Sequence, residues 1–491
     1  MTSAANAASL DRLKRRALSL GAVKACNHAI QFLLPVLLVR WLDSATFGEY
    51  RLLWLAVGTV MTVATLNMCG TLYFFVPRSE PRRKRLYIHQ ALLYLAVAGV
   101  VFGFLVSPAN PILPAAMRPL GQYGLLVPAF VALWVLGILL DHLPTVDERI
   151  SWQAYATVGV TGLRALFTGL AAWFTGELQV MLWTLIVVVL FKVALLAYYV
   201  RRHHGLGPPW FERSAASQQF RHSAPLGLNS AFYGLRGQAD QWVAASLFAL
   251  SSFAAFSIAA VVGQLMHLLR TSVMEAFLPS MSRLQARGDV RGMLEMNSRG
   301  NVMVGKLMYP LLAFGFAFAP EIVTVVYTAS YAEAAPVVRV YIVGMLAAVV
   351  EMGSLVMLLR QGTYALRVTG LTLVLSVATS WTAAQYLGLA GAAAGSVLGV
   401  YLDRALVLRR IARHAGIALR RLQEWRALAL ALGFAVLTGA LAWLIAELSL
   451  SRHGPLPRLV AGGAVFAAAY AAAYLAWERK DRTTRNVKDA A

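Results

Sequence analysis

The chain has too few charged residues to cover the surface of a soluble protein. Of its 491 residues, 13% are charged and 59% are hydrophobic, and the mean hydropathy is +0.63. A soluble chain of this length exposes far more polar side chains to water. The shortage of charge therefore excludes a soluble globular protein and predicts a polytopic membrane protein, whose long apolar segments face lipid.

Cysteine is almost missing from the sequence. Cys26 and Cys69 are the two cysteines, and both lie in apolar stretches. Two thiols in separate apolar stretches form neither a disulfide framework nor a metal cluster. We therefore expect no metal site, and nothing in the sequence indicates a cofactor.

Acidic residues are scarce as well. Asp and Glu number 22 against 44 Lys and Arg, which gives a formal net charge of +22. In a soluble protein this excess would suggest nucleic acid as a partner. In a membrane protein basic residues gather in cytoplasmic loops, and this rule accounts for nearly all of the excess, so we expect no nucleic acid to bind.

The chain also lacks long loops between its apolar segments. No external segment is large enough to be a folded domain. An integral membrane polymerase or ligase usually carries its catalytic groups on such a segment. We therefore expect that the protein is not an enzyme, and a membrane polymerase or ligase is the least favoured alternative.

Apolar windows of about 20 residues, the length that crosses a bilayer, recur from end to end. They predict an all-α polytopic membrane protein with about 14 transmembrane helices. The windows lie near 17–41, 51–76, 87–107, 121–141, 153–175, 178–200, 224–249, 253–278, 301–319, 335–359, 366–386, 389–408, 427–448 and 458–477.

The basic residues predict the orientation of these helices. Roughly 30 of the 44 Lys and Arg residues fall in alternate loops and near both ends of the chain, which the positive-inside rule assigns to the cytoplasm. Both termini are therefore expected to be cytoplasmic. A weak similarity between 40–58 and 245–263 suggests a repeated block of six helices, as is common in transporters.

These observations predict four parts of the chain. They are an N-terminal lobe of six helices at 1–200, a cytoplasmic linker at 201–222, a C-terminal lobe of six helices at 223–410, and helices 13 and 14 with a cytoplasmic tail at 411–491. The linker contains the turn-forming stretch "GLGPP".

Polar residues inside three predicted spans form stripes. In the first span Lys24, Asn27, His28 and Gln31 fall on one helix face at 100° per residue. A charge at the bilayer centre costs about 2.5–3.5 kcal/mol on insertion scales, so such residues usually face protein or a wet cavity.

The seventh and eighth spans repeat this design. Asn229, Tyr233, Arg236 and Asp240 share a stripe in the seventh span, where Arg236 and Asp240 have the i, i+4 spacing of an ion pair, and Gln241 adjoins it. His267, Arg270 and Glu275 share a broader face in the eighth span.

Each residue also has a structural interpretation. Lys24, Lys192 and Lys306 could extend to the interface, Arg236 and Asp240 could pin two helices, and the amides could bond between helices. Arg164 and Arg270 lie deeper, which favours a cavity. His28 and His267 could carry protons or simply satisfy a neighbouring group.

Cations outnumber acids within the spans. A cavity lined in this way attracts anions, and the planar fork of arginine suits phosphate. The expected passenger is an anionic amphiphile or a phosphorylated headgroup.

Four stretches carry a resemblance to a known superfamily: "FGEYRLLW", "QADQWVAASLFALSSFAAFSIAAVVGQL", "APEIVTVVYTASYAEAAPVVRVYIVG" and "LGLAGAAAGSVLG". These stretches, together with the order of the predicted helices, resemble the multidrug/oligosaccharidyl-lipid/polysaccharide (MOP) exporter superfamily. The resemblance is specifically to its Wzx-like polysaccharide-flippase branch. The resemblance implies two six-helix lobes around a central cavity, with a C-terminal helix pair, in the bacterial inner membrane.

The resemblance also implies a function. Such a flippase moves a polyprenyl-diphosphate-linked oligosaccharide, an O-antigen, capsule or exopolysaccharide repeat unit, to the outer leaflet by alternating access. Relatives place basic residues at positions comparable to Lys24, Arg51 and Arg270, and an acidic or polar site near Asp240. The drug-extruding branch usually has an acid in the first helix, which this chain lacks.

From these observations we expect the following roles. The cavity cations that bind substrate would be Lys24, Arg51, Arg164, Arg236 and Arg270. The polar substrate-binding groups would be Asn27, His28, Gln31, Asn229 and Gln241. The residues that couple H⁺ or Na⁺ would be Asp240, Glu275 and His267. Further partners would be membrane lipids and other polysaccharide assembly proteins. The alternatives are a peptidoglycan-precursor flippase and a cation-coupled drug antiporter of the same superfamily; a scaffold that does not transport is a fourth possibility.

Overall fold

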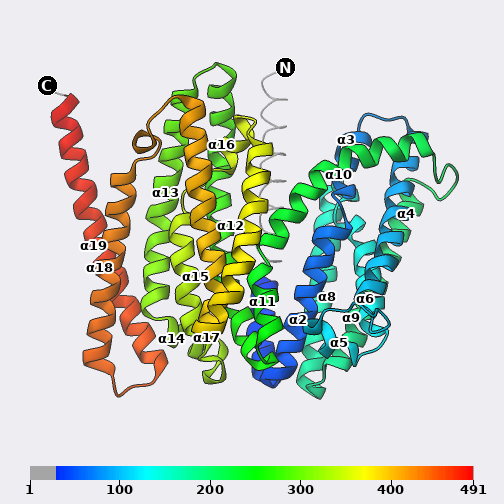
Figure 1. The fold of residues 1–491 in the computed structure, drawn as a ribbon, viewed down its shortest axis with the longest axis horizontal. Coiled ribbons are helices and arrows are strands. Elements are labelled where there is room, and N and C mark those ends of the chain that lie inside the picture. The colour runs from blue at the N-terminus through cyan, green and yellow to red at the C-terminus, as the bar shows by residue number, and fades with distance from the viewer. Residues whose placement is uncertain (1–28, 490–491) are drawn as a thin grey trace, which may run out of the picture. The chain divides into compact units, whose positions relative to one another are not determined.

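The computed structural model describes the backbone of residues 29–489, with all side chains in that range except those of 264–265 and 475–489. Every regular element in this range is a helix (Figure 1). The predicted all-α class is therefore confirmed. The chain forms two compact units, Met1–Gln238 and Ala239–Ala491. The predicted boundaries at 200, 222 and 410 stay predictions.

The predicted count of fourteen membrane-crossing helices is not confirmed within the described residues. Within the described residues eight helices are long and apolar enough to cross a membrane, or ten if each of two bent pairs is one span. Several predicted spans are short or interrupted. The helix α15 (Ala334–Ala348) has fewer than 18 residues, and the bent pairs are α2 with α3 and α13 with α14. Most of the first predicted span lies outside the described residues, which begin with the helix Ala29–Trp41.

Among the described residues, the first unit contains the helix Ala29–Trp41 and eleven further helices. They are α2 (Ser44–Ala64), α3 (Met68–Phe75), α4 (Pro81–Leu105), η1 (Ala115–Met117), α5 (Arg118–Gly121), α6 (Leu126–Gly137), η2 (Ile138–Asp141), α7 (Leu143–Val146), α8 (Ile150–Thr175), α9 (Leu178–His203), with α10 (Arg213–Arg236) as the last of the unit. Within this unit α6 packs against α4 and α9, α8 packs against α9, and α10 packs against α2 and α3.

Local sequence explains where these helices begin. The Asp43 carboxylate caps α2 by accepting hydrogen bonds from the backbone N–H groups of Ala45 and Thr46, at 2.9 and 3.0 Å. Such a cap satisfies donors that have no partner within the helix. Pro81 occupies the first position of α4, where its missing N–H is not needed.

The stretch between α9 and α10 is bound to α4. His89 is fully buried, and its two ring nitrogens lie 3.1 Å from the Pro209 carbonyl oxygen and 3.2 Å from that of Gly205. Gln90 donates a hydrogen bond to the Glu212 carbonyl. Residues 205–212 are thus held against the start of α4.

The second unit begins at the break that follows α10. Its helices are α11 (Ala239–Leu247), α12 (Leu250–Ala286), α13 (Val290–Ala317), α14 (Ala319–Tyr327), η3 (Ala329–Tyr331), α15 (Ala334–Ala348), α16 (Gly353–Leu358), α17 (Gly362–Ala415), η4 (Leu419–Arg421), α18 (Trp425–Leu450) and α19 (Pro455–Asp489). Here α12 packs against α13 and α15, α17 against α11 and α15, and α18 against α13 and α19 (Figure 1).

The 54-residue element α17 consists of two helical halves. Gly388 has φ 61° and ψ −143°, which is not helical and is a conformation that only glycine adopts readily. The halves then run side by side, because the Tyr364 hydroxyl donates to the Leu406 carbonyl and Arg410 donates to the Gln361 side chain. The predicted windows 366–386 and 389–408 correspond to these two halves.

A buried amide network fixes the start of α18. Asn297 and Asn301 of α13 are fully buried. Asn301 donates to the Gln423 side chain at 3.0 Å, and Gln423 donates to Asn297 at 3.1 Å. The Asn301 side-chain oxygen accepts from the Glu351 backbone N–H at 2.9 Å. Because these polar groups are paired, their burial costs little, and the network joins α13 to the residues before α18.

Candidate functional site

The structure places the predicted substrate-binding residues in two separate units. Lys24, Asn27 and His28 lie outside the described residues. Gln31 is exposed on the helix Ala29–Trp41 and Asn229 is exposed on α10, while Arg51 on α2, Arg164 on α8, Arg236 on α10, Gln241 on α11 and Arg270 on α12 are partly buried. The shared central cavity that would unite them stays a prediction.

In the first unit Arg164 lies among aromatic side chains. Its guanidinium carbon is 4.8 Å from the centroid of the Trp54 ring and 5.6 Å from that of Trp134. Its Nε is buried and has no hydrogen-bond partner among the described residues. Cation–π attraction is strongest for tryptophan and grows when water is excluded. Arg164 is therefore a cation held by ring faces, with hydrogen-bonding capacity left over.

A second cation, Lys192 of α9, also contacts Trp134. Its Nζ is 5.0 Å from the centroid of that ring and 2.6 Å from Asp141 Oδ2. Lys192 is 4% exposed, so the interpretation that it extends to the membrane interface is wrong. The reason is the interruption of the fourth span: α6 ends at Gly137 and η2 follows, which puts the Asp141 carboxylate within reach.

These five residues, Arg164, Lys192, Trp54, Trp134 and Asp141, form what we call the N-terminal group. Its charge is unbalanced, because it holds two cations, Arg164 and Lys192, and one carboxylate, Asp141. The excess positive charge lies in a region of low dielectric constant, where it acts over a longer range than in water. Such a group favours the approach of an anion.

The predicted polar stripe of the seventh span is not one helix face. Helix α10 ends at Arg236, and α11 begins at Ala239. The i, i+4 spacing of Arg236 and Asp240 is therefore not carried by one continuous helix, and their ion pair stays a prediction. The Arg236 guanidinium lies 5.7 Å from the centroid of the Tyr233 ring.

Asp240 is held by hydroxyl and backbone donors in the first turn of α11. It is 3% exposed. Its Oδ2 accepts a hydrogen bond of 2.7 Å from the Tyr341 hydroxyl, and its Oδ1 accepts one of 2.8 Å from the backbone N–H of Gln241. A buried carboxylate held by neutral donors can change its charge more easily than one in an ion pair.

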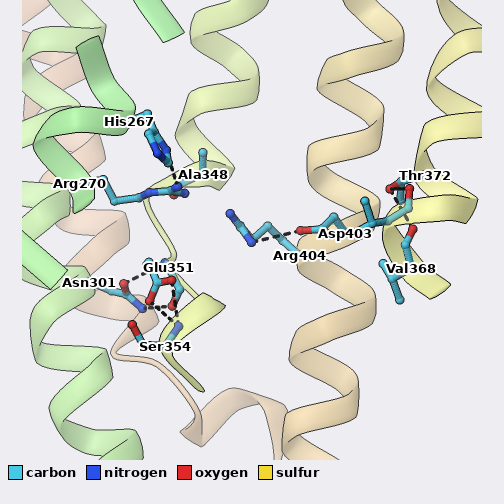
Figure 2. A network of polar contacts seen from close by, with 11 residues as sticks. His267, Arg270, Asn301, Ala348, Glu351, Ser354, Val368, Thr372, Asp403 and Arg404 are labelled. Carbon is cyan, nitrogen blue, oxygen red and sulfur yellow. Dashed lines mark hydrogen bonds and ion pairs between the residues drawn. The ribbon is translucent and has the colours of Figure 1, made fainter. Parts of the chain in front are cut away.

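Arg270 and His267 form a second contact group in α12 (Figure 2). Arg270 Nη1 donates to the Ala348 carbonyl at 2.9 Å, and Arg270 Nη2 lies 3.0 Å from His267 Nδ1. Ala348 is the last residue of α15. Glu275, more than one turn further along α12, is exposed. The structure thus brings two of the three predicted eighth-span residues together and leaves the third apart.

Figure 2 also shows two acids that lie near this group. Glu351 accepts a hydrogen bond of 3.1 Å from the Ser354 backbone N–H, and Asp403 lies 3.1 Å from Arg404. Both acids are engaged with close neighbours. They therefore do not oppose Arg270 as direct partners.

Sequence reasoning missed three residues of the N-terminal group. Trp54 and Trp134 lie in apolar predicted spans, where tryptophan is common. Nothing in the sequence therefore connects them to Arg164. Asp141 was assigned to the end of its span. The one available signal was the run "LLDHLP", in which an acid and a proline follow apolar residues and favour an interrupted helix.

Solved structures of transporters have the same fold. A structure titled "Lipid II flippase MurJ, inward closed conformation" matches with a TM-score of 0.71 and 10% identity, covering 94% of this chain and 99% of that one. An inward-facing multidrug resistance MATE family transporter of the MOP superfamily matches at 0.57 and 13%, covering 79% and 95%. A mutant of the Vibrio cholerae MATE transporter VcmN matches at 0.53 and 12%, covering 85% and 99%.

These matches define the fold: this multi-pass helical chain has the fold of the MurJ flippase structure and of MATE transporters of the MOP superfamily. The sequence model described as "Lipid II flippase MurJ" matches residues 164–457, more than half of the chain. The chain belongs to the MurJ lipid II flippase family. A comparison with curated protein sequences found no match.

The family match corrects one part of the sequence interpretation. The fold of the expected superfamily and the expectation of a transporter rather than an enzyme are confirmed, but the Wzx-like polysaccharide branch is not, because the matching family model is that of MurJ, a different branch. The O-antigen and exopolysaccharide passengers lose their support. The family match supports the alternative of a peptidoglycan-precursor flippase.

Proposed function

We propose that the protein flips lipid II, the lipid-linked precursor of peptidoglycan, across the bacterial cytoplasmic membrane. The observation that carries this proposal is the match of residues 164–457 to the lipid II flippase family. The matched range begins at Arg164 and includes Arg236 and Arg270. The fold similarity to a lipid II flippase over 94% of the chain supports the same conclusion.

The charges of the two units suit such a passenger. Lipid II carries a diphosphate, and arginine binds phosphate oxygens through paired N–H donors. Arg164, Arg236 and Arg270, with Lys24 and Arg51, would hold the diphosphate. Arg164 keeps an unused Nε donor among Trp54 and Trp134, and indole faces are good platforms for the apolar faces of sugar rings.

The remaining predicted residues take secondary roles in the proposal. Asn27, His28, Gln31, Asn229 and Gln241 would offer hydrogen bonds to the sugars. Asp240, Glu275 and His267 are the candidates for coupling H⁺ or Na⁺. Among these Asp240 is favoured by its burial and by its neutral hydroxyl donor Tyr341, because such a carboxylate can exchange a proton or a cation without breaking an ion pair. The partners would be lipid II and membrane lipids.

Complementation of two bacterial strains separates the candidate passengers. One strain is depleted of its lipid II flippase, and the other lacks its O-antigen repeat-unit flippase. We expect this chain to restore growth of the first strain and to leave O-antigen absent from the surface of the second. The reverse result would reject the proposal and support a flippase of polysaccharide repeat units.

The residue roles are tested by flipping of fluorescent lipid II in proteoliposomes. We expect Arg164→Ala and Arg270→Ala each to lower the rate at least tenfold, since a lost charge-assisted hydrogen bond costs about 1.5–3 kcal/mol. Arg452→Ala, at an exposed position, is the matched control and should flip at the rate of the unmodified protein. Normal rates for both variants at normal protein levels would remove Arg164 and Arg270 from the mechanism.

A further inference from the structure

The hydrogen bonds of His267 define its protonation state. Arg270 carries only N–H donors, so His267 Nδ1, at 3.0 Å from Arg270 Nη2, must be the acceptor. The His267 proton therefore resides on Nε2. This fits the other side of the ring, where Nε2 faces the Thr271 hydroxyl oxygen at 3.5 Å, while that hydroxyl donates to the His267 carbonyl at 2.8 Å. His267 is thus a neutral imidazole in this arrangement.

A second proton on His267 is incompatible with this contact. Protonation of Nδ1 would place an N–H donor and a positive charge against the Arg270 guanidinium. The pair would separate, because two like charges at this distance repel and the acceptor is lost. Arg270 would keep only its 2.9 Å bond to the Ala348 carbonyl, and its second N–H edge would become available.

The surroundings leave Arg270 as the charged group that acts on His267. Helix α12 packs against α11, α13, α15 and α16. Figure 2 shows that Glu351 accepts a hydrogen bond from Ser354 and that Arg404 pairs with Asp403 of α17. Asp240 of α11 accepts a hydrogen bond from Tyr341 of α15. Glu275 of α12 itself is exposed about two turns away, and among the described residues the charged side chain in contact with the His267 ring is Arg270.

We propose that His267 is a positioning residue that links proton uptake to binding of the anionic headgroup at Arg270. The inference rests on the proposed function, in which Arg270 binds the diphosphate. Neutral His267 holds Arg270 against α12. A bound diphosphate neutralises Arg270, which removes the repulsion and favours the protonated ring. Because coupling between two sites is reciprocal, protonation of His267 must in turn strengthen binding of the anion.

Lipid II affinity measured across pH tests this link in purified full-length protein in nanodiscs. The phosphodiester groups of lipid II keep their charge between pH 8.0 and 5.5, so any change in affinity reports on the protein. We expect the unmodified protein to bind lipid II about tenfold more tightly at pH 5.5 than at pH 8.0, within the fivefold to 150-fold range of ordinary coupling.

His267→Asn is the decisive variant. Its side-chain oxygen can accept from Arg270 as Nδ1 does, but it does not titrate, so the affinity should change by less than twofold over the same range. His414→Asn, at an exposed position in the last turn of α17, makes the same chemical change elsewhere and should keep the tenfold dependence. A variant of His267 that retains the full dependence would overturn the proposal.

A measurement without lipid II separates this inference from the proposed function. Sulfate is a dianion of constant charge over this pH range. In nitrogen-15 NMR of histidine-labelled protein, the signal of His267 is the one that is lost in His267→Asn. In the unmodified protein this signal should show the proton on Nε2, and added sulfate should make His267 protonate at higher pH. If lipid II binds at no pH, the proposed substrate is wrong. If sulfate leaves the titration of His267 unchanged, the link between proton and anion is wrong.

Discussion

At the scale of single residues, the structure separates intramembrane charges by what holds them. Lys192 is paired with Asp141, Arg164 is held by indole rings, and Arg270 is shared between a carbonyl and a histidine. These three cations looked alike in the sequence. Their different partners suggest different roles, with Lys192 structural and the two arginines available to an anion.

The Lys192–Asp141 pair gives a prediction for stability. Lys192→Met leaves the Asp141 carboxylate without its cation, and breaking a buried pair from one side costs about 3–5 kcal/mol. Because the Asp141 side chain is 34% exposed, we expect the free energy of unfolding to fall by less than this, by roughly 2–3 kcal/mol. The double variant Lys192→Met/Asp141→Asn should recover part of it. Thermal unfolding in detergent measures both, and equal loss in the single and double variants would contradict the pairing.

Asp147, in the turn between α7 and α8, gives a prediction for pH. Desolvation alone would raise its pKa, but hydrogen bonds from His204 and Tyr199, at 2.7 Å each, and the charge of Arg149 outweigh it, so the pKa is lowered from 3.8. A carboxylate with a lowered pKa stabilises the fold above its unfolded value and loses that contribution as pH falls through the folded value.

The melting temperature of the unmodified protein should therefore drop more steeply below about pH 4 than that of Asp147→Asn. Glu148→Gln, at the exposed neighbouring position, should follow the unmodified protein. If Asp147→Asn and the unmodified protein have parallel curves, the lowered pKa makes no contribution to stability.

At the scale of elements, interruptions of the helices place the functional side chains. The break after Gly137 brings Asp141 to Lys192, and the break at 237–238 separates Arg236 from the helix that carries Asp240. The end of α15 at Ala348 supplies the carbonyl that binds Arg270. A regular helix satisfies its own backbone acceptors, so a free carbonyl for Arg270 requires a helix end at this place.

The two halves of α17 give a prediction at this scale. A Cβ at Gly395 would clash with the Ser376 carbonyl oxygen and the Ser380 side chain of the other half. Gly395→Ala should therefore destabilise the protein by about 1–3 kcal/mol, the usual cost of overpacking. Gly370→Ala in the same element meets nothing within 4 Å and should be neutral or stabilising by about 0.4–1 kcal/mol. Equal thermal stability of the two variants would reject the close packing of the halves.

At the scale of the whole molecule, the distribution of basic residues predicts the topology. With both termini in the cytoplasm, the 287–291 turn lies inside and Arg452 lies outside. In a chain without Cys26 and Cys69, Arg452→Cys should react with a membrane-impermeant maleimide in intact spheroplasts, whereas Arg287→Cys should react only after lysis. A green fluorescent protein fused to the C-terminus should fluoresce. Reversed labelling would overturn the orientation.

The membrane class and the all-helical fold followed from the sequence alone, because apolar length and loop charge are properties of short segments. The same reasoning identified Arg164, Arg270 and Asp240 as intramembrane polar groups. The superfamily was indicated by a resemblance in four stretches of the sequence. The branch of the superfamily could not be predicted from these local properties, because MurJ and Wzx-like transporters share them. The match to the MurJ family model distinguished the two branches.

The partners of each charge were decided by the tertiary structure alone. Trp54, Trp134 and Asp141 come to Arg164 and Lys192 from three other helices, and Ala348 comes to Arg270 from another element. Helical periodicity tells which residues of one segment share a face. It carries no information on which segment packs against that face, and in a membrane this packing determines whether a cation is paired, held by rings or left ready for an anion.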